Sequence, residues 1–300
     1  MNAALPIDNL SGNLLLDEPM SKHTSWRIGG PADRYYQPAD LDDLARFLGQ
    51  LPADEPVTWL GLGSNLLVRD GGIRGTVIAT SGVVNGLQQI DECTVRAEAG
   101  VACAKVARFC ARAGLAGAEF LAGIPGTMGG ALAMNAGAFG GETWQVVAMV
   151  ETLDRQGRRY RRAPGVYQIG YRQVRGPEDE WFVAAHLQLE PGADPQALQT
   201  NIKQLLARRG DSQPTSLPNA GSVFRNPAGD YAARLIEACG LKGECEGAAC
   251  VSDKHANFII NTGGATAREV ETLIERVAQT VQEQQGVQLQ REVHIVGEAL

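Results

Sequence analysis

The sequence lacks a long apolar run and an excess of basic residues, and each absence excludes a class of protein. No run of 18 or so apolar residues occurs among its 300 residues, so no membrane-spanning helix is predicted. The net charge of −7 argues against a general nucleic-acid binder, and an anionic ligand must be met by local arginines or by backbone. The first segment, MNAALPIDNLSGNLLLDEP, has no basic region and contains acids, so we expect no signal peptide.

Cysteine and histidine are sparse and scattered, which argues against a metal centre. None of the six cysteines forms a C-x-x-C pair, and the four histidines show neither i,i+4 nor H-x-H spacing. Cys103 and Cys110 fall on one face of a predicted helix over 101–113, which is the spacing of core residues. We therefore expect buried free thiols, a reducing, cytoplasmic location and no bound metal. The cysteines stand at positions 93, 103, 110, 239, 245 and 250.

Small residues, by contrast, are concentrated in GAEFLAGIPGTMGGALAMNAGAFGGE, residues 117–142, which hold eight glycines, six alanines and no lysine or arginine. Glycine lets a ligand approach the backbone, and successive amides form concave nests that bind phosphate. A glycine-rich connector is the alternative, but the glycine density, Pro125 and the interleaved apolar residues favour ordered backbone. We predict a cradle for a diphosphate, with Glu119 and Glu142 pointing away from the anion.

A shorter phosphate-sized turn, GLGSN at 61–65, lies between two apolar runs within residues 57–68. It is not the dinucleotide-binding fingerprint, because Leu66 stands where the third glycine is required. The long glycine-rich stretch fails that fingerprint too. No G-x-x-x-x-G-K-[ST] or G-x-S-x-G motif occurs, so neither P-loop nor serine-hydrolase chemistry is predicted.

The remaining pattern predicts an α+β chain. Residues 146–154 and 158–162 form a hairpin, and the five arginines from Arg155 to Arg162 favour a solvated hairpin over an anion site because the rest of the chain is acidic. A helix begins at Pro195 and continues to Arg209.

Several signals describe the C-terminal part of the chain. Asp230 is expected to cap a short helix, and Thr266 and Glu269 form a capping box for a longer one. Residues 287–296 are expected to form the closing strand. The outline is a larger glycine-rich ligand domain followed by a smaller C-terminal domain.

Three polar residues are candidates for chemistry, although each also has an ordinary explanation. Arg172, in GYRQVR, could be one more exposed cation. Ser222 follows Gly221, where a serine usually hydrogen-bonds backbone, and Glu292 could be the solvent-facing half of a strand alternation. Nothing in the spacing brings the three together.

Seven motifs, in chain order, are similar to those of one enzyme family. They resemble the UDP-N-acetylenolpyruvoylglucosamine reductases, flavoenzymes that complete UDP-N-acetylmuramate for peptidoglycan, and in particular the shorter branch, which lacks an extra substrate-capping loop. The resemblance covers almost the whole chain. The motifs are TSWRIGGPAD (24–33), GLGSNLLV (61–68), GIPGTMGGALAMNAGAFGGE (123–142), GYR (170–172), PNAGSVFRNP (218–227), VSDKHANFIIN (251–261) and EVHIVGE (292–298).

The resemblance implies a vanillyl-alcohol-oxidase-like (PCMH-type) FAD-binding region over 1–208, in two α+β subdomains divided near residue 85. A smaller α+β substrate-binding domain would occupy 209–300. FAD would be non-covalent, with its diphosphate held by backbone amides. The matching cofactor-binding positions are Arg27, Gly29, Gly61, Gly63, Ser64, Asn65, Gly123, Gly126, Thr127, Gly129, Gly130, Asn135, Gly137 and Ala138.

The implied reaction has two halves: NADPH reduces the flavin and leaves, and the enolpyruvyl ether of UDP-N-acetylglucosamine then takes the hydride. Arg172 would bind the substrate carboxylate, and Glu292, protonated or sharing a proton, would stabilise the enolate-like intermediate. Ser222 would donate the proton as general acid, with Arg225 or a water chain stabilising its alkoxide. The matching substrate-binding positions are Tyr171, Arg172, Arg225 and Asn226.

The chain departs from the family pattern at four positions. Val174 replaces a serine that would make one secondary hydrogen bond, and Phe139 replaces a tyrosine near the diphosphate loop. His294 stands where arginine is usual, and Val296 where isoleucine is usual. His294 could tune Glu292, but an exposed histidine is the favoured interpretation.

Two other functions fit the sequence less well. A sugar or alcohol oxidase of the same fold would often attach FAD to a His or Cys in the first phosphate loop, and 61–68 contain neither. A non-catalytic flavin-binding protein would not need Arg172, Ser222 and Glu292 together. We expect a cytoplasmic enzyme that acts on a small-molecule sugar nucleotide with NADPH, and no nucleic-acid, membrane or obligatory protein partner.

Overall fold

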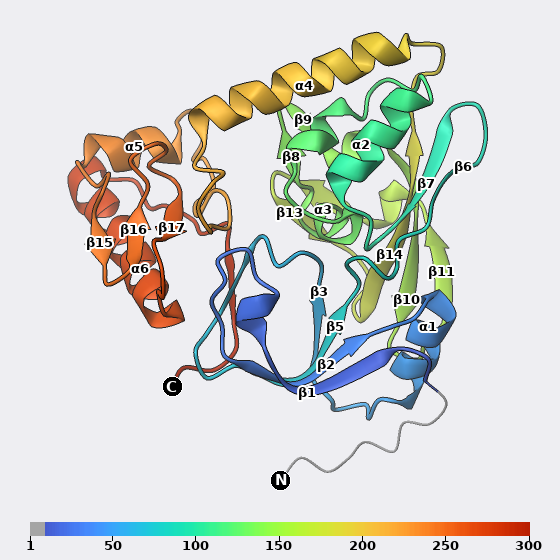
Figure 1. Cartoon of the computed structure of the whole chain (residues 1–300), viewed down its shortest axis with the longest axis horizontal. Coiled ribbons are helices and arrows are strands. Elements are labelled where there is room, and N and C mark those ends of the chain that lie inside the picture. Colours follow the sequence, from blue (N-terminus) through green and yellow to red (C-terminus); the bar gives the residue numbers. More distant parts are fainter. Residues whose placement is uncertain (1–9) are drawn as a thin grey trace. The chain divides into compact units, whose positions relative to one another are not determined.

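A computed structural model describes residues 10–300 (Figure 1). Residues 1–9, the first part of the segment predicted not to be a signal peptide, lie outside the described residues. The chain divides into two compact units: the first holds residues up to Leu15, Tyr35–Gly61 and Gly75–Arg209, and the second holds Leu16–Arg34, Leu62–Arg74 and Gly210–Leu300. The predicted cofactor-binding domain (1–208) and substrate-binding domain (209–300) are defined by their ligands, so this division does not test them and both remain predictions.

An antiparallel sheet of order β11-β10-β14-β7-β6 forms the frame of the first unit. The predicted hairpin is confirmed, since β10 pairs with β11 and places Thr152 opposite Tyr160. Four of its five arginines contact acids or carbonyls of the protein, as in the ion pair of Arg158 with Asp154; the four are Arg155, Arg158, Arg159 and Arg162. The bounds are β6 (Leu87–Gln89), β7 (Thr94–Glu98), β10 (Val147–Asp154), β11 (Arg159–Arg162) and β14 (Glu180–Gln188).

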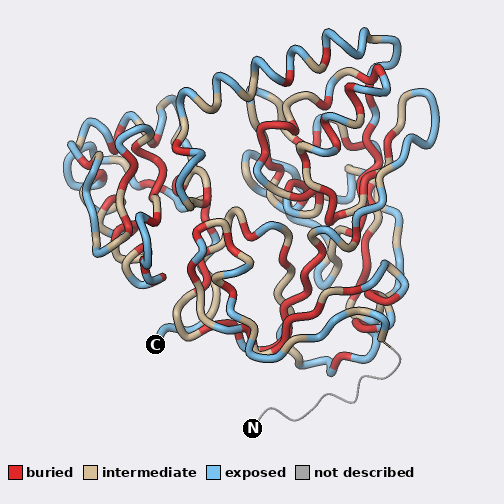
Figure 2. The backbone as a smooth tube through the Cα atoms, viewed as in Figure 1, coloured by how far each residue is buried: buried red, intermediate tan, exposed pale blue. Residues whose placement is uncertain are grey.

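Two helices, α2 (Cys103–Arg112) and α3 (Met128–Met134), share one hydrophobic core with this sheet. Cys103 and Cys110 are both buried on the inner face of α2, as predicted, and burial raises the pKa of each thiol to about 12. The predicted helix α4 (Pro195–Ser212) begins at Pro195 and continues three residues past Arg209. Most of α4 is exposed, with only Leu198 and Ile202 buried (Figure 2).

Helix α1 (Leu41–Gln50) is fixed to its surroundings by a buried carboxylate. Asp43 is fully buried and accepts hydrogen bonds from the Tyr36 hydroxyl, from Ser11 N–H at 2.8 Å and from Ala39 N–H at 2.9 Å. Burial by itself raises the pKa of Asp43, but these bonds and the charge of Arg46 outweigh it, so the pKa lies below the ordinary 3.8. The ionised carboxylate therefore stabilises the fold at neutral pH.

We expect Asp43→Asn to destabilise the protein by about 2–4 kcal/mol at pH 7, because an amide NH2 would face donors in a buried site. Since the folded pKa is lowered, the stabilisation is present above pH 3.8 and is lost as pH falls through the folded pKa. Urea unfolding at pH 7 and at acidic pH measures both effects. Asp42→Asn, on the exposed face of the same helix, is the control, and equal losses in the two variants would contradict this role for Asp43.

The second unit has its core around α6 (Ala267–Gln285), with α5 (Ala232–Ala238) and a sheet of order β15-β16-β17. The capping box of Thr266 and Glu269 is confirmed. Trp26 is fully buried in this core and its Nε1 donates to Ile259 O at 2.8 Å. The strands are β15 (Cys245–Glu246), β16 (Ala249–Val251) and β17 (Ile259–Asn261).

Two local predictions in this unit are wrong. Asp230 does not cap α5; the side chain of Asn226 instead accepts from Ala232 N–H at 3.1 Å, because the preceding loop folds back over the helix start. Of the expected strand 287–296, only β18 (His294–Val296) forms, pairing in parallel with β4 (Leu66–Val68). The residues before β18 lie beside the irregular segment that follows Gly221. Between them the structure has one isolated β-bridge, Phe224 to Arg291, and no continuous strand.

The prediction of free thiols is wrong for Cys245 and Cys250, which form a disulfide. The register of β15 against β16 places the two cysteines opposite each other, with Cα atoms 4.1 Å apart. Sequence spacing did not indicate this pair, because the pairing arises only when the hairpin forms. Cys93 and Cys239 are free and half-buried.

The remaining strands include a sheet of order β1-β2-β5-β3, in which β3 and β5 run parallel. Among residues 10–300, no helix is both long and apolar enough to cross a membrane. The other elements are β1 (Asn13–Pro19), β2 (Pro31–Gln37), β3 (Val57–Leu60), β5 (Ile73–Ala79), β8 (Gly137–Ala138), β9 (Gly141–Glu142), β12 (Gln168–Gly170), β13 (Gln173–Arg175) and the 3₁₀ turns Met20–Lys22, Glu119–Gly123, Thr143–Gln145 and Pro164–Val166.

Candidate flavin and substrate site

The long glycine-rich stretch is ordered, as predicted, and contributes α3, β8 and β9. Some of its amides are used inside the protein: Met128 N–H donates to Val101 O and Gly129 N–H to Ala99 O, both at 2.9 Å. These two amides are not free for an anion. A Cβ on Gly129 would lie 2.9 Å from Ala99 Cβ, so glycine here allows close helix packing.

Thr127 stands at the centre of the predicted cradle. Its hydroxyl is buried and has no hydrogen-bond partner. A Cβ on Gly61 would lie 2.4 Å from Thr127 Oγ1, and the nearest atom to a Cβ on Gly130 would be the same oxygen at 3.9 Å. The turn at Gly61 and the start of α3 at 127–130, which are distant in sequence, therefore meet around one hydroxyl that is available to a ligand.

These residues line a cavity of about 300 Å³ in the first unit, with aromatic walls. Trp59 stacks on Trp181 at 5.2 Å between ring centroids, and Tyr167 lies 5.3 Å from Phe182. Trp59 Nε1 and the Tyr167 hydroxyl are buried without partners, like Thr127 Oγ1. Three unsatisfied polar atoms around flat apolar walls fit a ligand with both hydrogen-bonding groups and aromatic rings, such as FAD.

Sequence reasoning missed the aromatic walls of this cavity. Trp59 lies two residues before Gly61 on β3, which is the one local signal for it. The other wall residues follow the hairpin in sequence, far from Trp59, and no local pattern places them beside it. They are Tyr167, Val174, Gly176, Pro177, Glu180, Trp181 and Phe182.

Arg172 is held against the glycine-rich stretch by the hairpin of β12 and β13. Its guanidinium donates to Gly137 O at 3.0 Å and Asn135 O at 3.3 Å, and Asn135 Nδ2 returns a bond to Gly170 O at 3.1 Å. A Cβ on Gly137 would lie 3.0 Å from Arg172 Nη1, so glycine leaves room for the guanidinium. Tyr171, at the same turn, is exposed and packs against the Arg172 guanidinium.

The other predicted positions in this stretch contact the protein itself. A Cβ on Gly123 would lie 2.3 Å from the Phe139 ring and 2.8 Å from Ala138 Cβ, and Gly126 O accepts from Cys103 N–H. Glu142 accepts from Asn135 Nδ2 at 2.8 Å, and Glu119 accepts from Gly117 N–H. Both carboxylates therefore have protein partners.

In the second unit, the segment around Arg27 is hydrogen-bonded to and packed against the segment around Gly63. Ser25 N–H donates to Gly63 O at 3.1 Å, and a Cβ on Gly63 would lie 2.1 Å from His23 O. Gly29 packs on Val68, where a Cβ would approach the Val68 Cβ to 2.8 Å. The two segments that carry Arg27, Gly29, Gly63, Ser64 and Asn65 are therefore brought together.

Ser222 and Glu292 lie on adjacent extended segments of the same unit. Glu292 N–H donates to Val223 O at 2.8 Å, and Asn65 Nδ2 donates to Glu292 O at 3.1 Å. Ser222 and Glu292 are both half-buried. Hydrogen bonds thus bring together the segments that carry a predicted proton donor, a predicted stabilising carboxyl group and a predicted cofactor residue, which spacing alone could not do.

Arg225 lies on the same segment as Ser222, and His294 lies on the same segment as Glu292. Arg225 Nε is buried without a partner, which makes it available to a ligand. His294 is exposed, as predicted, yet its surroundings partly desolvate the ring and, with the charge of Arg225, lower its pKa. At neutral pH we therefore expect His294 to be uncharged. Asn226 serves α5 as its cap.

Comparison with known families first gives the class of protein. Residues 32–162 match the family model described as "FAD binding domain". The cradle at Thr127 and the aromatic cavity lie within or next to this region. The chain therefore contains an FAD-binding domain, and its fold mixes α and β elements, as the predicted fold class states.

The particular family follows from the rest of the chain. Residues 213–296 match the "UDP-N-acetylenolpyruvoylglucosamine reductase, C-terminal domain". The chain is 62% identical to the UDP-N-acetylenolpyruvoylglucosamine reductase of Alkalilimnicola ehrlichii, over 96% of both chains. It is 61% identical to that of Methylococcus capsulatus, over 96% of this chain and 94% of that one. It belongs to the UDP-N-acetylenolpyruvoylglucosamine reductase family.

A solved structure agrees with this assignment. The enzyme of the same name from Thermus caldophilus superimposes with a TM-score of 0.82 at 31% identity, covering 96% of this chain and 99% of that one. The resemblance noted in the motifs is confirmed. Within residues 10–300, no group of three or more His, Cys, Asp or Glu side chains is placed to hold a metal ion.

We expect Trp59→Phe to weaken FAD binding by about tenfold, since the variant keeps the ring but removes one buried donor worth about 1.4 kcal/mol. Titration of the apoprotein with FAD, followed by quenching of flavin fluorescence, measures the dissociation constant. Trp181→Phe is the matched control because its indole N–H is not among the buried unpartnered atoms. An unchanged dissociation constant in Trp59→Phe would remove this N–H from the cofactor site.

Proposed function

We propose that this enzyme reduces the enolpyruvyl ether of UDP-N-acetylglucosamine-enolpyruvate to UDP-N-acetylmuramate, with NADPH as the hydride donor. The observation that carries the proposal is the full-length identity of 62% to a reductase named for that substrate. The hydrogen bond that places Glu292 beside the Ser222 segment supports it. The product is a peptidoglycan precursor, which accords with a cytoplasmic enzyme of small-molecule substrates.

The residues around Thr127 would hold the FAD. Bound FAD supplies the hydride carrier between NADPH and the enolpyruvyl substrate. The Thr127 hydroxyl, Trp59 Nε1 and the Tyr167 hydroxyl are the buried groups that need partners, and Gly61 and Gly130 leave the backbone open beside them. Arg27, Gly29, Gly63, Ser64 and Asn65 are proposed to complete the binding residues.

Arg172 is proposed to bind the substrate carboxylate. Its guanidinium is planar and already fixed by two carbonyl contacts, so little side-chain freedom is lost when a carboxylate is bound. Tyr171, Arg225 and Asn226 are proposed as further substrate contacts. The unpartnered Nε of Arg225 would be satisfied by an anionic oxygen of the substrate.

Ser222 is proposed to donate a proton to the carbon next to the carboxylate, and Glu292 to hydrogen-bond the charge that develops on the substrate. A serine hydroxyl is a weak acid, so its alkoxide needs a nearby positive charge. Arg225, three residues along the same segment, is the candidate for that charge.

We expect Glu292→Gln to slow product formation by about 10–10³-fold while flavin reduction by NADPH changes little, because the amide keeps a donor but cannot share a proton. Anaerobic stopped-flow absorbance of the flavin band separates the two half-reactions. Glu298→Gln, an exposed acid on the same C-terminal segment, is the control. Unchanged turnover in Glu292→Gln would remove this residue from the site.

The proposed reaction is tested by adding NADPH anaerobically to the purified protein and then the enolpyruvyl sugar nucleotide. Bleaching of the flavin band, followed by recovery only with that nucleotide, is the expected result. Bleaching by simple sugars or alcohols, followed by recovery with oxygen but not with the nucleotide, would favour an oxidase instead. A protein that takes up FAD but shows no bleaching would favour a non-catalytic flavin protein.

A further inference from the structure

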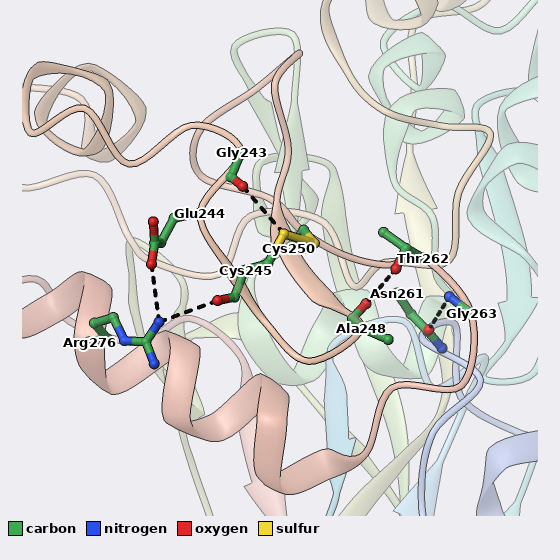
Figure 3. Close-up of a disulfide and its surroundings, with 9 residues drawn as sticks. All are labelled: Gly243, Glu244, Cys245, Ala248, Cys250, Asn261, Thr262, Gly263 and Arg276. Carbon is green, nitrogen blue, oxygen red and sulfur yellow. Dashed lines mark hydrogen bonds and ion pairs between the residues drawn. A yellow bond between two sulfur atoms is a disulfide. The ribbon is translucent and has the colours of Figure 1, made fainter.

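The outer edge of the sheet β15-β16-β17 carries the disulfide between Cys245 and Cys250 (Figure 3). The two cysteines face each other in antiparallel register, and only residues 246–249 connect them. Cys245 is exposed and Cys250 is half-buried, so a small thiol can reach the Sγ atom of Cys245. Exposed disulfides are the ones that exchange readily.

The hairpin is held in place by contacts other than the sulfur bridge. Arg276 of α6 binds the Glu244 carboxylate at 3.2 Å and Cys245 O at 3.4 Å (Figure 3). At the tip, Gly247 lies so close to the Glu269 carboxylate that a Cβ would come within 1.9 Å of it. Because β16 also pairs with β17, the two sulfur atoms would stay opposite each other after reduction.

The reduced form has a hydrogen-bond acceptor ready for it. Gly243 O lies 3.3 Å from Cys245 Sγ (Figure 3). A disulfide sulfur carries no proton to donate, whereas a thiol at the same position does. Reduction therefore creates a thiol whose proton has an acceptor already in place, which favours reversible exchange.

We propose that Cys245 and Cys250 form a reversible dithiol/disulfide site whose exchange partners are a low-molecular-weight monothiol and its disulfide. In the oxidising direction, the Cys245 thiolate attacks the small disulfide, releases one monothiol and forms a mixed disulfide. The Cys250 thiolate then attacks Cys245 Sγ, closes the bridge and releases the second monothiol. The protein loses two electrons to the small disulfide, and the thiol protons end on the two monothiols.

The disulfide lies in the same layer as the segment that carries Ser222, where the layer is the β15-β16-β17 sheet together with residues 219–223. At the other edge of the same sheet, Asn219 bridges Ile260, and Val223 N–H donates to Asn257 O at 2.9 Å. Closing the bridge stabilises this layer by restricting the unfolded chain, and a loop this short makes the effect modest. Exchange at this hairpin does not depend on the proposed reaction, so peptide mass and melting temperature measure it independently of enzyme activity.

Redox equilibration of the full-length holoenzyme tests the exchange. The protein is held in glutathione buffers of varied ratio, alkylated and digested with trypsin, which releases both cysteines in one peptide, residues 243–254. We expect this peptide to pass from doubly alkylated to unalkylated over about a hundred-fold change in [thiol]²/[disulfide]. Cys93 and Cys239 stay free of any bridge throughout. A bridge that never forms, or one that persists in excess reduced glutathione, would overturn the proposal.

Melting measurements test the structural consequence. A reductant should lower the Tm of the wild type and of Cys239→Ser by about 3–8 °C. It should not change the Tm of Cys245→Ser or Cys250→Ser, which should melt with the reduced wild type. An equal reductant effect in Cys245→Ser would assign the responsible thiols elsewhere and would contradict the proposal.

Discussion

Replacing Ser222 by alanine should slow reoxidation of the reduced flavin by the enolpyruvyl substrate about 10²–10⁴-fold, the usual contribution of a positioned proton donor. Reduction of the flavin by NADPH should change little, because no proton from Ser222 is needed in that half. The backbone should keep its place, since Val223 O and Val223 N–H remain bonded to Glu292 and Asn257. Single-turnover stopped-flow absorbance measures each half separately.

Two further variants sharpen this result. Ser222→Cys keeps a more acidic donor and should recover part of the lost rate. Ser252→Ala removes a buried hydroxyl of the same unit that accepts from Lys254 N–H, so it should lower stability and leave both half-reactions alone. Equal losses in the two half-reactions of Ser222→Ala would refute the proton-donor role.

Replacing Arg172 by alanine should raise the KM for the enolpyruvyl nucleotide and slow flavin reoxidation, together about 10²–10³-fold in kcat/KM. A bidentate, charge-assisted pair with the carboxylate is lost, which is worth roughly 3–4 kcal/mol in a water-excluded site. Arg172→Lys keeps the charge without the planar fork and should recover only part of the activity. Steady-state kinetics with varied nucleotide measure the effect.

Arg175→Ala is the matched control, because this exposed arginine lies three residues along the same hairpin. Arg172 also binds Gly137 O and Asn135 O of the glycine-rich stretch, so its loss could disturb the flavin site. The ratio of flavin to protein absorbance checks this, and we expect the ratio to stay constant. Loss of flavin in Arg172→Ala would assign this arginine to the cradle and not to the substrate. An unchanged KM would remove it from substrate binding.

Features that depend on neighbouring residues could be predicted from the sequence. The capping box of Thr266 and Glu269, the hairpin around Gly157 and the buried face of Cys103 follow from short spacings, and the structure has all three. The glycine density of residues 117–142 likewise indicated ordered backbone that a ligand can approach. These patterns are local because caps, turns and helical faces are decided within a few residues.

Features that depend on pairing between distant segments could not be predicted from the sequence. The Asp230 carboxylate is bound by Arg234 and by Tyr231 N–H, and Asn226 instead accepts from Ala232 N–H at the start of α5. Cys245 and Cys250 were paired by strand register, which spacing does not specify. Trp59 on β3 and Tyr167, which lies between the 3₁₀ turn Pro164–Val166 and β12, line one cavity although they are far apart in the sequence.

The sequence by itself determined the family, the fold class and the residues worth testing, because its motifs are distinctive and lie in order along the chain. Only the tertiary structure decided which of those residues are neighbours. It placed Glu292 beside the Ser222 segment, Arg172 on the Gly137 carbonyl and the Thr127 hydroxyl between Gly61 and Gly130. The physical reason is that hydrogen bonds and packing act over a few ångströms in space, whatever the separation along the chain.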